Sequence, residues 1–187
     1  VAWSRLQSNS ATAASGAISA TYTSNVSYGS VLIAAVVLSS SQATNVALSA
    51  VCTCADGSSN SLAFIGGVAF STNGYAGLFA MATPAGDVGT KPAITGTFSG
   101  SIDNFGSSIL IQEIAGISAT ADGTLASNDA SSTGPATTGA YSSGAANEYL
   151  AVVYGDPGFA VTLTTPAGYT AAAYNLTSSN TDVSMFY

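Results

Sequence analysis

Residues Val31–Ser40 read VLIAAVVLSS, and the rest of the chain can be interpreted around this stretch. It contains eight consecutive apolar residues rich in β-branched types, and a turn signal at Tyr28–Ser30 precedes it. A run of this length is too short to span a bilayer and fits one strand that is buried on both faces. We therefore expect two layers of structure to cover it, and we expect a polar side chain at Val36 to unfold the protein.

The composition limits the partners of the chain. Of its 187 residues, 47% are hydrophobic and only 6% are charged, and the net charge is −7. Arg5 and Lys91 are the two basic residues, so the chain cannot neutralise a nucleic-acid backbone, and binding to anionic membranes is disfavoured. Ser, Thr, Asn and Gly must supply the polar surface, which suits packing against protein or carbohydrate.

The N-terminal sequence VAWSRLQSNS has no charged segment followed by an apolar one. No signal peptide is therefore visible, so the chain is either a mature form that is already trimmed or one made in a cytoplasm that lost only its initiator Met, and we expect the second. The same segment already has the alternation of a strand.

Alternating apolar and polar residues predict an all-β chain, because helix caps and apolar residues at 3.6 spacing are almost absent. We expect a single domain over residues 1–187, folded as a two-sheet antiparallel β-sandwich that is jelly-roll-like, with about eleven strands. The segments concerned are Ala2–Ser8, Ile18–Thr23, the central run, Val46–Cys54, Leu62–Phe70, Tyr75–Met81, Ile94–Phe98, Ser107–Ile114, Glu148–Tyr154, Phe159–Thr164, Tyr169–Leu176 and Asp182–Tyr187.

The connections carry their own signals. Asn9–Gly16 reads as a linker, and Gly66-Gly67 predicts a bulge or a close backbone approach. Asn73-Gly74 is a strong hairpin signal that pairs the strands on its two sides. From Ala119 to Ala146 the sequence is mostly small and polar, which indicates a long covering loop or arm.

The two cysteines, Cys52 and Cys54, lie two residues apart and so share one face of an extended strand. A disulfide between such close neighbours is strained, and the simplest interpretation is two small buried apolar residues. A metal site would need further thiolates or imidazoles, and the chain contains no His. A partner chain could still supply them.

No residue set in the sequence amounts to an active site, so we predict a protein that is not an enzyme, with no cofactor and no catalytic or metal residues. The missing His excludes a Ser-His-Asp triad within the chain, and a Ser-Lys variant would depend on Lys91, directly before Pro92. Most acids occupy turns, where they bond their own backbone. Glu113 and Glu148 are the acids in strand contexts, and we expect Glu113 at an edge position that reaches solvent. The turn acids are Asp56, Asp87, Asp122 and Asp156, from which a calcium site is a further possibility.

Tyrosine rings can stack on sugars, and Tyr75, Tyr141 and Tyr169 lie near turns where they would be accessible. Tyr at a sheet edge with its hydroxyl in water is, however, the ordinary outcome.

The chain resembles jelly-roll-like β-sandwich modules found in structural proteins of tailed bacteriophages and in some secreted bacterial proteins. The resemblance extends over nearly the whole chain and rests on strands and turns rather than on chemistry. The residues that carry it are Leu6-Gln7-Ser8, Ile18 to Tyr22, Ser24-Asn25-Val26, Gly29, Val31–Val37, Asp56 to Asn60, Tyr75–Met81, Phe98, Ile111 to Gly116, Glu148-Tyr149-Leu150 and Pro166 to Tyr169.

The resemblance implies a virion-surface role, such as a capsid decoration protein, a head fibre or a tail-associated adhesion module. We therefore expect a non-enzymatic structural protein of the virion surface that is made in the host cytoplasm. Its partners would be other virion proteins, copies of itself and, in a tail or secreted setting, a host-surface glycan. A sugar-binding module is the alternative, and a glycan hydrolase that uses Glu113 or Glu148 is the third hypothesis.

Overall fold

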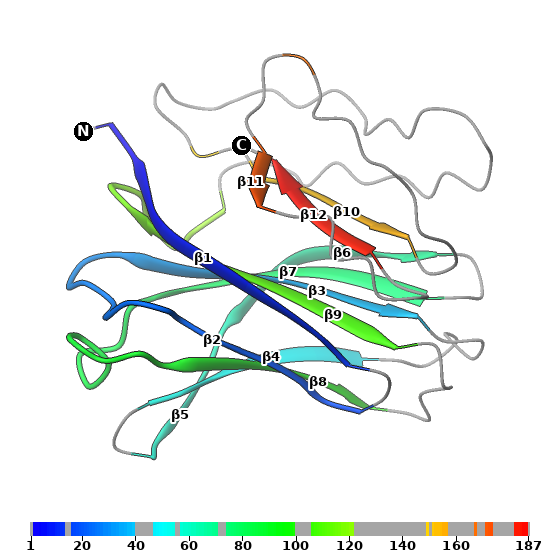
Figure 1. The fold of residues 1–187 in the computed structure, drawn as a ribbon, viewed down its shortest axis with the longest axis horizontal. Coiled ribbons are helices and arrows are strands. Elements are labelled where there is room, and N and C mark those ends of the chain that lie inside the picture. Colours follow the sequence, from blue (N-terminus) through cyan, green and yellow to red (C-terminus); the bar gives the residue numbers. More distant parts are fainter. Residues whose placement is uncertain are drawn as a thin grey trace.

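The computed structural model describes residues 2–13, 16–39, 47–54, 57–70, 74–99, 106–121, 149, 151–156, 167, 171–173 and 182–186. These ranges contain twelve strands and no helix, which confirms the all-β class (Figure 1). No helix that is long and apolar enough to cross a membrane occurs in them.

The strands form antiparallel sheets. The five-stranded sheet has the order β1 (Ser4–Ala13), β9 (Ser107–Ala115), β3 (Val31–Ser39), β7 (Gly74–Ala82) and β6 (Ala63–Phe70). The four-stranded sheet has the order β2 (Ile18–Thr21), β8 (Ala93–Ser99), β4 (Ala47–Thr53) and β5 (Ser59–Ser61). A third sheet has the order β10 (Val152–Asp156), β12 (Asp182–Phe186) and β11 (Ala171–Ala173).

β3 is the middle strand of the five-stranded sheet and is buried on both faces, as its sequence predicts. Leu32, Ala34 and Val36 face a core that the four-stranded sheet closes with Ile18, Ala50, Cys52 and Ile94. Residues on the opposite face of β3 belong to a second core. Two layers of structure therefore cover this strand, one on each side.

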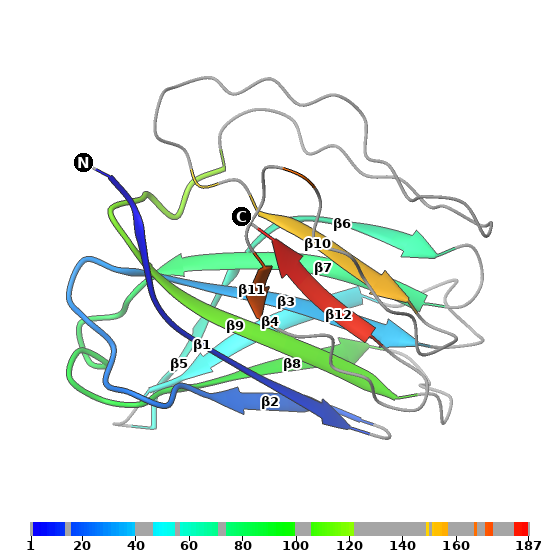
Figure 2. The ribbon, with the colours of Figure 1, turned by 45° about the horizontal axis from the view of Figure 1, so that its top comes forward.

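The second core lies beneath the three-stranded sheet. It contains Val31, Ile33, Ala35, Val37, Leu110 and Ile114, with Trp3, Tyr149 and Ala151 packed against it. The Trp3 and Tyr149 rings meet edge to face with centroids 4.9 Å apart. In Figure 2, β10 and β12 run over the five-stranded sheet, where β10 contacts β7 and β3 and β12 contacts β3 and β9. The expected pair of sheets is therefore accompanied by a third, smaller layer.

Two details of the predicted strands are confirmed and two are wrong. β6 and β7 form the expected hairpin, and their register shifts between Phe64 and Gly66, directly before the Gly66-Gly67 pair at which a bulge or a close backbone approach is predicted. The supposed linker at Asn9–Gly16 is in part strand, because β1 continues to Ala13. Ala11 and Ala13 pack on the core and the Asn9 amide donates to the Thr21 carbonyl at 2.8 Å, so small and polar residues sustain this strand. The polar strand β5 carries no apolar pattern and was not predicted.

Several predicted features lie outside the described residues. These are Asn73, Glu148, the segment Phe159–Thr164, and residues 122–146 of the predicted long loop.

Gly67 provides a test of the β6–β7 pairing. A methyl group at this position would lie 2.4 Å from the Ala76 carbonyl oxygen and 2.8 Å from the Tyr75 ring, and the carbonyl cannot move without disturbing the sheet. We expect Gly67→Ala to lower the free energy of unfolding by about 2 kcal/mol, measured by urea denaturation. The matched control is Gly57→Ala, which strains a positive φ but meets nothing within 4 Å and should cost less. Equal costs would contradict the close approach at Gly67.

Candidate functional site

The outer face of the four-stranded sheet is lined by hydroxyl groups. Side chains alternate along each strand, and the outward ones are exposed or half-buried. Those with hydroxyls are Ser19, Thr21, Ser49, Thr53, Ser59, Ser61, Thr95 and Thr97, which we call the hydroxyl face. The other outward positions described on this sheet, Val51 and Ala93, are apolar, so the described part of this face carries no charge.

Hydroxyls on this face bond one another across the strands. Thr95 donates to Ser19 Oγ at 3.1 Å, and the hydroxyls of Ser49 and Thr97 share a short hydrogen bond. A hydroxyl group that already has a hydrogen-bond partner in the protein loses less free energy when water is removed from it. The free-energy cost of desolvating this face is therefore lower than that of desolvating a charged face.

Glu113 does not lie at an edge and does not reach solvent, so that prediction was wrong. It belongs to β9, which has β1 and β3 on its two sides, and its side chain is 1% exposed. Its carboxylate accepts hydrogen bonds from Gln7 Nε2 at 2.7 Å, the Ser27 backbone amide at 2.7 Å and Ser30 Oγ at 2.8 Å. The carboxylate therefore holds the turn before β3 against β1 and β9.

The other residues singled out in the sequence do not gather around Glu113. Lys91 is exposed directly before the buried Pro92. The half-buried Tyr75 lies close to Gly67, so its ring takes part in strand packing. Asp56, Asp122, Glu148, Tyr141 and Tyr169 lie outside the described residues.

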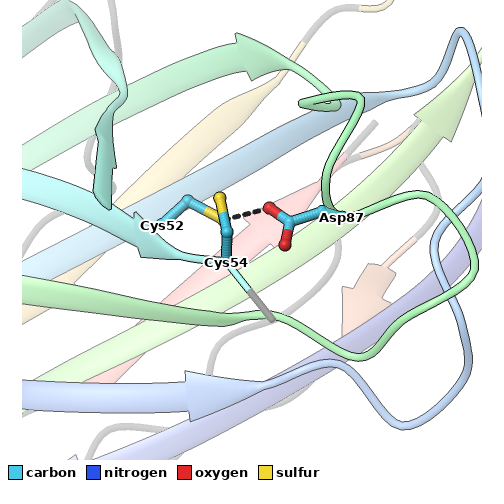
Figure 3. Close-up of side chains that lie close together, drawn as sticks. All are labelled: Cys52, Cys54 and Asp87. Carbon is cyan, nitrogen blue, oxygen red and sulfur yellow. Dashed lines mark hydrogen bonds between the residues drawn. The ribbon is translucent and has the colours of Figure 1, made fainter. Parts of the chain in front are cut away.

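Cys52 and Cys54 meet Asp87 at one end of the sandwich core (Figure 3). Cys52 lies near the end of β4 and Cys54 directly follows this strand. Both are buried free thiols, so the predicted burial is confirmed. Asp87 comes from the turn between β7 and β8 and is fully buried. The turn holds its backbone, because the Asp87 amide donates to the Pro84 carbonyl at 3.0 Å and the Thr90 amide donates to the Asp87 carbonyl at 2.9 Å.

The three side chains are in direct contact. The Cys52 thiol donates to Asp87 Oδ2 at 3.2 Å, and the two sulfurs and a carboxylate oxygen all lie within 4.8 Å of one another. Asn60 on β5 donates its amide Nδ2 to Cys54 Sγ at 2.8 Å. Sequence reasoning placed Asp87 in a turn but missed that its side chain enters the core, because Cys52 and Asp87 are 35 residues apart.

Burial raises the pKa of the Cys52 thiol far above its ordinary value, and the hydrogen bond to Asp87 raises it further. Burial likewise raises the pKa of Cys54. Both sulfurs therefore carry protons near neutral pH, and neither is a reactive thiolate on its own.

In comparisons with known proteins, no family model, curated protein or solved structure matches the chain.

Proposed function

We propose that the protein is a non-enzymatic structural component of a tailed-bacteriophage virion surface, a capsid decoration protein that packs on the shell as an oligomer. The observation that carries the proposal is the order of the strands. From β1 to β9 the chain passes back and forth between the five-stranded and the four-stranded sheet. This path supports jelly-roll connectivity, which is common in viral capsid and lectin domains.

The neighbours within each sheet agree with that path. β9 lies between β1 and β3, and β8 lies between β2 and β4, so late strands return between early ones in both sheets. Interleaving of this kind is what two Greek keys produce. The hairpin β6–β7 then extends one edge of the five-stranded sheet.

The hydroxyl face supports packing against a shell. The net charge of −7 makes copies of the chain repel one another, but the hydroxyl face contributes nothing to that repulsion. A broad sheet face with paired hydroxyls can approach a neighbouring protein without burying an unpaired charge.

A lysine on the hydroxyl face should prevent attachment. We expect electron micrographs of the phage particles that encode this chain to show the wild-type chain in a regular array on their surface. Ser49→Lys should lower its occupancy at least tenfold, because the ammonium group would be buried without a partner. Ser118→Lys is the matched control, since Ser118 is exposed on the segment after β9, and its occupancy should stay at the wild-type level.

Circular dichroism must first establish that both variants fold. Particles that lack the wild-type chain would contradict the virion proposal as a whole. Ser49→Lys occupancy equal to that of wild type would contradict the assignment of this face.

A sugar-binding module is the second candidate, and Tyr28 is the observation that favours it. Its ring is 86% exposed in the turn before β3, where a sugar could stack on it. This tyrosine was not among those singled out in the sequence. Binding to a glycan array that is lost in Tyr28→Ala and kept in Tyr28→Phe, with no chain on particles, would favour this function over the first.

A further inference from the structure

We propose that Cys52, Cys54 and Asp87 bind one Zn²⁺ ion at the end of the sandwich core. The site joins β4 to the turn between β7 and β8, and it does not depend on the proposed virion role.

The spacing of the three ligand atoms is close to what the ion requires. Zn–S bonds of about 2.3 Å in a tetrahedron place two sulfurs about 3.8 Å apart, and a carboxylate oxygen about 3.6 Å from each sulfur. Here the three atoms lie within 4.8 Å of one another, and Cys52 Sγ lies 3.2 Å from Asp87 Oδ2. Side-chain adjustments of about an ångström would bring them to these values, without movement of the strands.

The donor set selects a borderline-soft cation. Thiolate sulfur disfavours Mg²⁺ and Ca²⁺, whereas Zn²⁺ accepts both sulfur and carboxylate oxygen. The chain contains no His, and no fourth Cys, Asp or Glu joins the cluster among the described residues. From this part of the chain, the fourth tetrahedral position falls to the second Asp87 oxygen or to a water molecule.

The charge in the core is unchanged by loading. Before binding, two neutral thiols and one carboxylate carry a single negative charge. When Zn²⁺ binds, both S–H bonds break, two protons pass to solvent and two Zn–S bonds form, so two thiolates, one carboxylate and the ion again sum to a single negative charge. No electron is transferred, and no oxidant or reductant is needed.

The surroundings of the cluster also favour a bound cation. A carboxylate in a low-dielectric core interacts strongly with a nearby cation. Asp87 is fully buried and contacts the Cys52 thiol, so a divalent ion bound between these side chains would interact strongly with its carboxylate. The Asn60 amide already points at Cys54 Sγ, and donors of this kind support metal-bound sulfur.

The test is titration of the reduced, chelator-treated full chain with Cd²⁺, a spectroscopic substitute for Zn²⁺ that gives a thiolate-to-metal charge-transfer band in the ultraviolet. We expect the band to saturate at one ion per chain and Zn²⁺ to displace Cd²⁺ with the same stoichiometry. Bound metal should also protect Cys54 from alkylation. Folded wild-type chain that gives no band at saturating Cd²⁺ would overturn the proposal without recourse to any variant.

Variants then test the ligands. Cys52→Ser and Cys54→Ser should each lower the affinity for Cd²⁺ at least 100-fold, and the isosteric Asp87→Asn should lower this affinity about tenfold or more. Ile94→Val is the matched control, because Ile94 pairs with Cys52 in the sheet and belongs to the same core but offers no ligand atom. Its affinity should stay within about twofold of wild type. Should the serine variants fail to fold, Asp87→Asn decides the matter, and a wild-type affinity in that variant would overturn the site.

Discussion

Val36→Asn should abolish folding. Val36 lies in the middle of β3, is fully buried, and points into the core between the five-stranded and four-stranded sheets. Directly opposite is Gly96 on β8, where an added methyl would lie 3.0 and 3.2 Å from the two Val36 methyl carbons. An asparagine amide would find apolar side chains here, so its hydrogen bonds with water would be lost without replacement.

The expected cost comes from two sources. Removing the valine methyls loses about 1–2 kcal/mol of burial, and an unsatisfied amide adds about 2–3 kcal/mol. Their sum of about 3–5 kcal/mol approaches the whole stability of many domains. Circular dichroism and gel filtration should therefore find an unfolded or aggregated variant rather than a folded protein that has lost only assembly.

Gly96 supplies the control for this packing. Gly96→Ala should destabilise the fold because its methyl meets Val36 and Ile18, and Val36→Ala should leave a cavity at the same place. The double variant should then be more stable than the sum of the two single costs, by about 1 kcal/mol. A cooperatively folded Val36→Asn variant, or additive costs in the double variant, would mean that β3 does not pack on β8 at this position.

The sequence of β3 predicted its burial correctly because eight apolar residues in succession leave neither face suited to water. Local signals succeeded elsewhere too: the glycine pair in β6 marks its bulge. These local patterns could not predict which strands cover the second face of β3, because the three-stranded sheet comes from the distant C-terminal part of the chain.

Errors arose where small or polar residues are held by partners that are remote in sequence. The end of β1 has no strong alternation, yet it pairs with β9 about a hundred residues later. Glu113 looked suited to an edge because a lone buried carboxylate is rare, and its three donors lie 83 to 106 residues away. The Cys52–Asp87 contact was hidden for the same reason. Periodicity identifies the strands, whereas the polar interior depends on which strands become neighbours.

Glu113→Ala should be the second severe change. The substitution removes the acceptor for Gln7 Nε2, the Ser27 amide and Ser30 Oγ together. Gln7 also donates to the Ser24 carbonyl, and the single Ser30 hydroxyl proton can turn to the Ser27 carbonyl instead, so these two donors retain a partner. Of the three donors, we expect the Ser27 amide to contribute the largest loss of stability. With charged hydrogen bonds contributing about 1.5–3 kcal/mol each and partial compensation at two of the three, we expect a loss of about 3 kcal/mol.

If Glu113 is a structural acceptor and not a catalytic acid, the loss of stability in Glu113→Ala should appear first around the Ser27 amide. Urea denaturation measures the global cost, and hydrogen exchange at the Ser27 amide should accelerate in Glu113→Ala before distant amides change. Gln7→Ala is the matched comparison: it removes one donor and leaves the carboxylate two others, so its cost should be about 1 kcal/mol. Glu113→Gln should fall between the two, because its amide group faces a donor while its remaining oxygen still accepts. If Glu113→Ala unfolded at the wild-type urea concentration, the carboxylate would have to reach water. A side chain at that depth in β9 could do so only if β1 were not paired beside it, and the assignment of the sheet edge would then change with the role of the acid.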